Sequence, residues 1–132
     1  MTVFESKAII ARSASEVYSF LSDLNNHEKL MPENVYNWSS TSDEARFTIQ
    51  NMAKLALKVS NRIENSTIII APAEEVPFGV ELRWVISDNG DNSTTAVLTI
   101  SADLNMMMKM LASGPLQKLT DHQTQKLKSV LA

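Results

Sequence analysis

The chain contains no cysteine, and only three glycines and four prolines among its 132 residues. The lack of cysteine excludes disulfides, thiolate nucleophiles and cysteine-ligated metals. The glycines, Gly79, Gly90 and Gly114, are too far apart to form a phosphate-binding loop or a dinucleotide fingerprint. We therefore expect no nucleotide or other cofactor.

Long hydrophobic runs and an excess of one charge are also absent. No stretch approaches the ~18 apolar residues of a membrane span, and Glu5 and Lys7 interrupt the N-terminus where a signal peptide would be apolar. The net charge of −3, with both signs interspersed, gives no electrostatic footprint for nucleic acid or an anionic membrane. We expect one cytoplasmic domain, residues 1–132, without nucleic-acid binding or integral membrane association.

What is present is a series of short apolar segments separated by turn residues. Seven of them have the length and composition of strands: Val3–Ile10, Val35–Ser40, Ala45–Gln50, Lys54–Ile63, Thr67–Ala71, Phe78–Ser87 and Thr94–Ala102. Helical patterns occur only at Ser13–Leu24 and beyond Asn105. This order predicts an α+β fold, in which a seven-stranded antiparallel sheet curls around a long C-terminal helix.

Two local signals are specific. Ser13 and Glu16 have the spacing of a capping box at the start of the first helix. The turn sequence at residues 88–91 separates two alternating segments, which predicts a hairpin.

The C-terminal helix has two apolar arcs on different sides of the helical wheel. One arc comprises Leu116, Leu119, Gln123, Leu127 and Val130. The other comprises Met106, Met107, Met110 and Leu111. Because Gly114 and Pro115 lie between the arcs, we predict a bend or a restart there, with Ser113 as a possible N-cap, so that both arcs reach the sheet.

This layout resembles the START and pollen-allergen-like superfamily with the helix-grip fold (SRPBCC), and within it the bacterial polyketide-cyclase-like proteins. The resemblance is carried by the capped helix Ser13–Leu24, the segment Leu30–Val35 and the long final helix. It implies a sheet that grips the last helix around a hydrophobic cavity for lipids, sterols, polyketides or other apolar molecules. It does not fix a reaction, because members include carriers, cyclases, hydrolases and co-chaperones.

Gln123 is the most informative candidate residue, because it occupies the middle of an apolar arc. A buried amide must meet a hydrogen-bond partner, which here is a water, a tryptophan N–H or a ligand. The side chains predicted to line a ligand pocket with it are Trp38, Leu57, Trp84, Leu98, Met110 and Leu127. Small residues at presumed inward positions leave room for a pocket of ~300 Å³ or more. They are Ser6, Ala8, Ala96 and Ala102.

The two histidines give weaker signals. His27 stands in a polar stretch and is predicted to be solvated, whereas His122 falls at the edge of the final apolar face, where it is either solvated or an acid or base at the cavity mouth. Two isolated histidines without a matching second ligand do not predict a zinc site. Catalytic residues stay unassigned.

The favoured function is non-catalytic binding of a small apolar or amphipathic, lipid- or polyketide-like molecule between the sheet and the final helix. One alternative is a cyclase- or hydrolase-type enzyme that acts in the same cavity. Another is a protein-interaction module with a collapsed cavity, for which a homodimer is possible.

Overall fold

The computed structural model describes residues 1–132. Its helices are α1 (Ala14–Ser22), the 3-10 helix η1 (Leu24–Leu30) and α2 (Met106–Val130). Its strands are β1 (Thr2–Ile10), β2 (Val35–Ser40), β3 (Glu44–Ile49), β4 (Ala53–Ile63), β5 (Thr67–Pro72), β6 (Val80–Asp88) and β7 (Thr94–Ala102).

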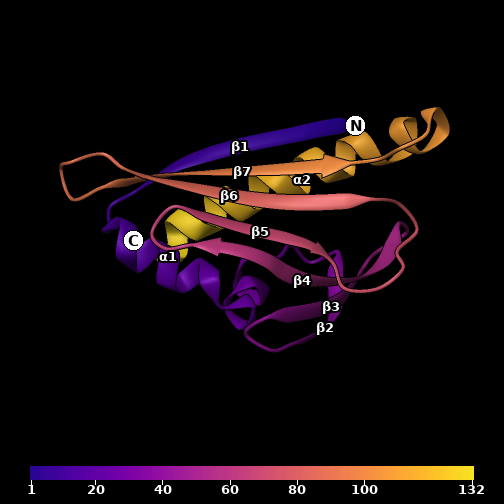
Figure 1. Cartoon of the computed structure of the whole chain (residues 1–132). Helices are drawn as coiled ribbons and strands as arrows, with labels where there is room; N and C mark the ends of the chain where they lie inside the picture. The colour runs from indigo at the N-terminus through magenta and orange to yellow at the C-terminus, as the bar shows by residue number, and fades with distance from the viewer.

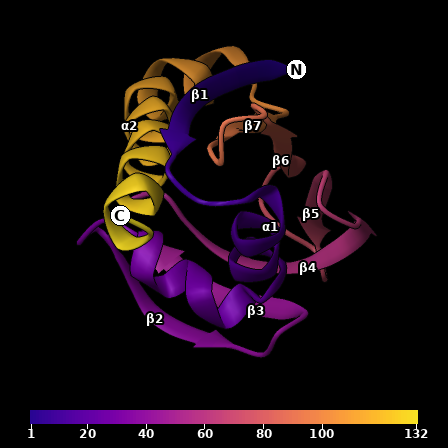
Figure 2. The same cartoon turned by 90° about the vertical axis from the view of Figure 1, so that its left-hand side faces the viewer.

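All seven strands form one antiparallel sheet in the order β1-β7-β6-β5-β4-β3-β2. The sheet curls so strongly that β1 and β2, its two edge strands, face each other across an open side (Figure 2). The helix α2 runs along this open side and closes it (Figures 1 and 2). The predicted α+β helix-grip architecture is confirmed.

The tight turns depend on asparagine. Asn51, Asn65 and Asn92 have φ values of 61°, 58° and 64° and lie between consecutive strands. Asparagine enters this left-handed region more readily than other non-glycine residues, because its short side chain bonds locally. Asn37, with φ 56°, lies where the register between β2 and β3 shifts.

The start of α1 follows the predicted capping pattern in part. Ser13 Oγ accepts a hydrogen bond from Glu16 N at 3.2 Å. The Glu16 carboxylate does not return to the backbone of Ser13, but accepts from Ser13 Oγ and from Arg12 Nη1. The N-cap hydrogen bond is therefore formed. The second hydrogen bond of a capping box is replaced by an ion pair between Glu16 and Arg12.

The core lies between the concave face of the sheet and the helices. The predicted β6–β7 hairpin is confirmed, with Trp84 opposite Leu98 on its buried face. From the second arc of α2, Leu116, Leu119 and Leu127 are buried as predicted, and Val130 is half-buried at the end of the helix.

The helix α2 is continuous from Met106 to Val130, so the predicted restart at Gly114 and Pro115 is wrong. The cap of α2 is Asn105, whose side chain accepts a hydrogen bond from Met108 N at 2.8 Å. The Ser113 hydroxyl donates to the backbone carbonyl of Lys109, one turn earlier, and so does not cap a new helix. Pro115 removes one hydrogen bond of the helix and lies on its exposed side, and the helix continues past it.

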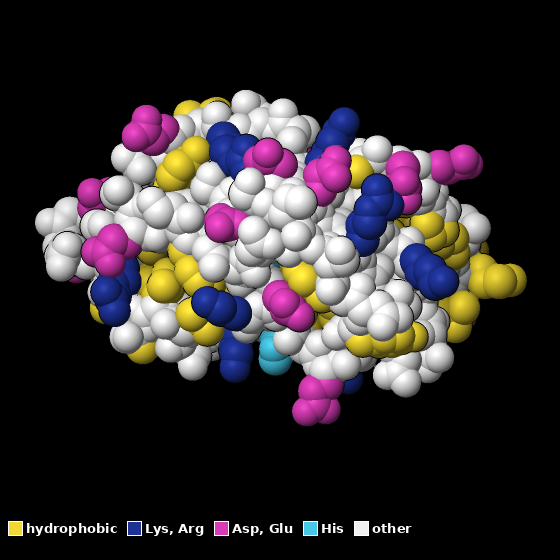
Figure 3. Space-filling view, turned by 90° about the horizontal axis from the view of Figure 1, so that it is seen from below, with side chains coloured by type: hydrophobic (Ala, Val, Ile, Leu, Met, Phe, Trp, Pro, Cys, Tyr) yellow, Lys and Arg dark blue, Asp and Glu magenta, His cyan; other side chains and the backbone are white.

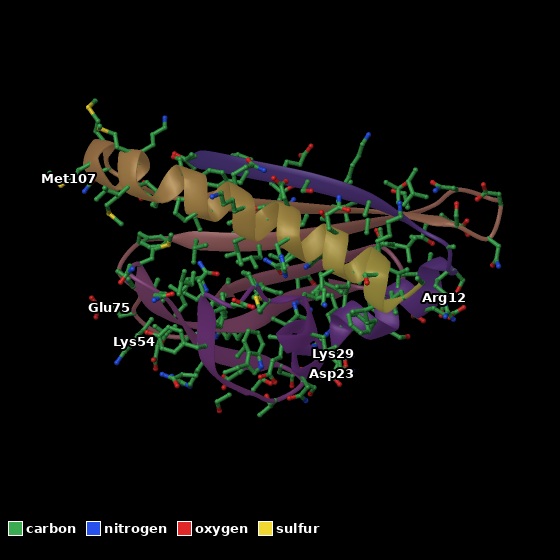
Figure 4. The ribbon with its side chains drawn as sticks, turned by 180° about the vertical axis from the view of Figure 1, so that it is seen from behind. Arg12, Asp23, Lys29, Lys54, Glu75 and Met107 are labelled. Atoms are coloured by element: carbon green, nitrogen blue, oxygen red, sulfur yellow. The ribbon has the colours of Figure 1, made fainter.

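The first apolar arc of α2 stays in solvent, contrary to prediction. Met106, Met107, Met110 and Leu111 are 73–83% exposed. The reason is geometric: the first turns of α2 project beyond the ends of the strands, so no sheet lies beneath them (Figures 1 and 4). Met107 points away from the protein at this tip (Figure 4).

The substitution Gly114→Ala should raise the free energy of unfolding by about 0.5–1 kcal/mol, because glycine is a poor helix former and a Cβ at this position meets no atom within 4 Å. Urea unfolding measures the change. The matched control is Gly90→Ala, which should destabilise the protein because Gly90 has a φ of +81°. A loss of stability in Gly114→Ala would show that the helix is not continuous there.

Candidate functional site

A small cavity lies between the sheet and α2. Its volume is about 20 Å³, which is room for one water molecule. Eleven hydrophobic side chains and Gln123 line it. The prediction of a pocket of ~300 Å³ or more at this place is therefore wrong for the protein in this state.

Beside the cavity, α2 also lies close to β1. Ser6 Oγ on β1 and Thr124 Oγ1 on α2 are 2.6 Å apart, a hydrogen bond between helix and strand. Thr120 and Thr124 are both fully buried. The small residues that were expected to leave room, such as Ser6 and Ala8, instead accommodate the helix.

Gln123 is fully buried, and neither Oε1 nor Nε2 has a hydrogen-bond partner in the protein. The Nε1 atom of the buried Trp84 also lacks one. Gln123 and Trp84 lie at the same level of the fold. Thr124, next to Gln123, bonds Ser6 on β1. Ser6 pairs with Leu98 on β7, and Leu98 pairs with Trp84 on β6. Each unpartnered buried group costs about 1–3 kcal/mol, so this level of the core has unused polar capacity.

The structure separates the residues that were predicted to line one pocket. Leu57 lines the cavity together with Gln123. Trp84, Leu98 and Leu127 are fully buried in the surrounding core but do not line it. The placement of Met110 in the pocket is wrong, since its side chain is 82% exposed on the projecting tip of α2.

Trp38 borders a second cavity of about 20 Å³ under η1. Its ring stacks on Phe47 with centroids 5.1 Å apart, and Phe47 lines both cavities. Trp38 Nε1 already donates to Ser40 Oγ at 2.9 Å. This indole is therefore not available to Gln123.

His27 lines the second cavity and is 2% exposed, so the prediction of a solvated histidine is wrong. Its Nε2 donates to the carbonyl oxygen of Leu21 at 2.8 Å, since a carbonyl can only accept. Burial lowers the pKa of His27, against smaller opposing effects of the Leu21 hydrogen bond and the charge of Asp23. The missed signal was the period of three: Leu24, His27 and Leu30 lie on one buried face, as i and i+3 do in a 3-10 helix.

The remaining candidate, His122, is half-buried on α2 beside Pro32, Asn34 and Lys118 in an outer pocket. No group of three or more histidine, aspartate or glutamate side chains is placed to hold a metal ion. None of the helices has the length and apolarity needed to cross a membrane. The inner cavity itself is lined by no titratable group.

Neither a family model nor a curated protein sequence matches the chain. Several solved structures resemble it over nearly its whole length. A START superfamily protein from Mycobacterium smegmatis is 20% identical, with a TM-score of 0.69, covering 98% of this chain and 96% of that one. The KanY protein is 14% identical, with a TM-score of 0.79, covering 98% and 97%.

The Aha1 dimer from Colwellia psychrerythraea is 19% identical, with a TM-score of 0.67, covering 99% of this chain and 96% of that one. These similarities establish that the chain has the START-like helix-grip fold. At such identities they concern the fold alone, so membership of the polyketide-cyclase-like branch stays a prediction.

The buried His27 makes stability depend on pH. Because its pKa is lowered in the folded protein, the unfolded chain takes up a proton first as the pH falls below about 6.5. The free energy of unfolding should therefore fall from that pH downward, until the folded protein is protonated as well. Above about pH 6.5 the histidine makes no pH-dependent contribution.

Urea unfolding between pH 7.5 and 5 tests this, with His27→Gln as the control that keeps a donor but carries no titratable group. The difference in stability between the two proteins should change with pH in this window. An identical pH dependence in both would contradict the buried neutral histidine.

Proposed function

We propose that the protein binds a small, mostly apolar molecule with at least one polar group between the sheet and α2. The observation that carries this proposal is the amide of Gln123, which is fully buried, has no protein partner for either polar atom and lines an otherwise hydrophobic cavity. An apolar enclosure with few fixed polar groups is typical of small-molecule sites. A single polar group of a ligand would satisfy the amide.

A ligand fits only if the inner cavity becomes larger. Two side chains line both this cavity and pockets on the outer surface. Phe78 lines both the inner cavity and an outer pocket, and Leu119 lines the inner cavity and another outer pocket. Phe78 precedes the first residue of β6 and is not part of the strand ladder. Its side chain can therefore move without breaking strand pairing.

A second candidate is the protein-interaction module. It is supported by the volume of only about 20 Å³ between sheet and helix, together with the exposed Met106, Met107 and Met110. Exposed apolar clusters of this kind are common at protein contacts.

Native mass spectrometry of freshly purified protein distinguishes the two functions. Binding predicts a retained small molecule, and the substitution Gln123→Leu should reduce its occupancy while leaving the ligand-free protein equally stable or more stable by about 1–3 kcal/mol, since the unpaired amide is gone. Gln125→Leu is the matched control, because Gln125 is an exposed glutamine on the same helix and does not line the cavity.

A strict dimer without any retained molecule would support the interaction module. Equal occupancy by the small molecule in the Gln123→Leu and wild-type proteins would show that the Gln123 amide does not contact it. A water that satisfies Gln123 in a ligand-free monomer, with no molecule retained, would contradict the binding proposal.

A further inference from the structure

Two adjoining pockets lie on the outer side of α2, and they go beyond the cavity of the proposed function. Their volumes are about 430 and 410 Å³. Both are lined by Asn34 and Pro115, so they adjoin each other between α2 and the loop that precedes β2. We call the two pockets together the α2 groove. Unlike the inner cavity, it needs no rearrangement to admit a small molecule.

One end of the α2 groove combines hydrophobic side chains with the amides of Asn34, Gln50 and Asn51. Met52, Phe78, Met108 and Leu111 line it, and none of its ten lining residues is charged. Leu111 is 73% exposed here, so its side chain is available to a ligand. Hydrophobic side chains gather at this end of the molecule, on the right in Figure 3, where α2 begins in Figure 1.

The other end of the groove is basic. Lys118 and His122 are the only titratable groups among its six lining residues. Residues four apart on a helix have neighbouring side chains, so both reach the same region. Neither forms an ion pair with a carboxylate, and the nearby Asp121 accepts a hydrogen bond from Gln117 at 3.0 Å. Glu33, in the loop across the groove, is exposed.

We propose that the α2 groove binds a carboxylate with a medium-length hydrocarbon chain. The carboxylate lies at Lys118 and His122, and the chain extends toward Leu111 and Met108. From Leu111 to Lys118 the helix rises roughly 10 Å, at about 1.5 Å per residue, which matches an extended chain of medium length. A lysine ammonium and an imidazole N–H both donate to a carboxylate, whereas an aliphatic ammonium ligand would be repelled by Lys118.

The probe is decanoate below its micellar concentration, titrated into protein with ¹³C-labelled methionine methyl groups. The methyl signals of Met52 and Met108 in the groove should shift, and those of Met106 and Met107, which do not line it, should not. Decanol should bind about tenfold more weakly, and decyltrimethylammonium more weakly still, because each lacks the charge-assisted bonds.

Two variants separate the ends of the groove. Lys118→Glu should weaken decanoate binding about tenfold or more and leave decanol binding unchanged. Lys7→Glu is the matched control, since it makes the same change in net charge at an exposed position of β1, and it should leave both affinities within about twofold. Leu111→Ser should weaken decanoate and decanol alike.

Equal binding of decanoate, decanol and the ammonium compound would overturn the proposal, as would an unchanged decanoate affinity in Lys118→Glu or the absence of any shift at Met52 and Met108. Gln123→Leu should bind decanoate normally, because Gln123 does not line the groove. The proposal for the groove and the proposal for the inner cavity are therefore tested by separate measurements.

Discussion

The close packing of α2 against β1 is the interaction on which the rest of the structure depends. A curled sheet has an open side, and here the helix closes it through a 2.6 Å hydrogen bond between Ser6 and Thr124. Gln117 Nε2 reaches the carbonyl oxygen of Glu5 on the same strand, so the helix also satisfies part of an edge that would otherwise be free to pair. The distance between helix and sheet sets the volume of the cavity between them.

The polar groups on the buried side of α2 are satisfied with one exception. The Thr120 hydroxyl donates to Leu116 O, and the Thr124 hydroxyl bonds Ser6 and Asp121 O. The neighbouring Gln123 has no such partner. Since a leucine would fill the same space without this cost, the glutamine is more easily understood as a group that meets something other than protein.

The fold could be predicted because strand alternation and helix spacing are local properties. Every predicted strand is present, with its boundaries shifted by at most two residues. In a strand such as β7 the inward residues follow from the period of two. The face of α2 that carries Leu116, Leu119 and Leu127 was predictable for the same reason. The exposed arc was not, because a helical wheel does not show where the sheet ends. Asn105 caps α2 three residues after β7 ends at Ala102, so the helix begins beyond the strands.

The size of the cavity could not be predicted either. Small residues such as Ser6 and Ala8 are compatible with an empty space or with a helix that approaches closely, and only the position of α2 decides between them. The burial of His27 escaped the sequence argument because the polar residues around it indicated a solvated stretch, whereas the period of three in η1 places His27 on one buried face with Leu24 and Leu30.

The position of α2 also explains why there are two candidate sites. A helix that lay further from the sheet would leave one continuous space, whereas here Phe78 and Leu119 divide an inner cavity of about 20 Å³ from the outer groove. The inner space can discriminate by hydrogen bonding, since its only polar lining group is Gln123 and any mismatch there is buried. The groove can discriminate only by charge and length, because Lys118 is exposed to water, which weakens each contact. A molecule held first in the groove and then between sheet and helix would be selected by charge at the first site and by its polar group at the second.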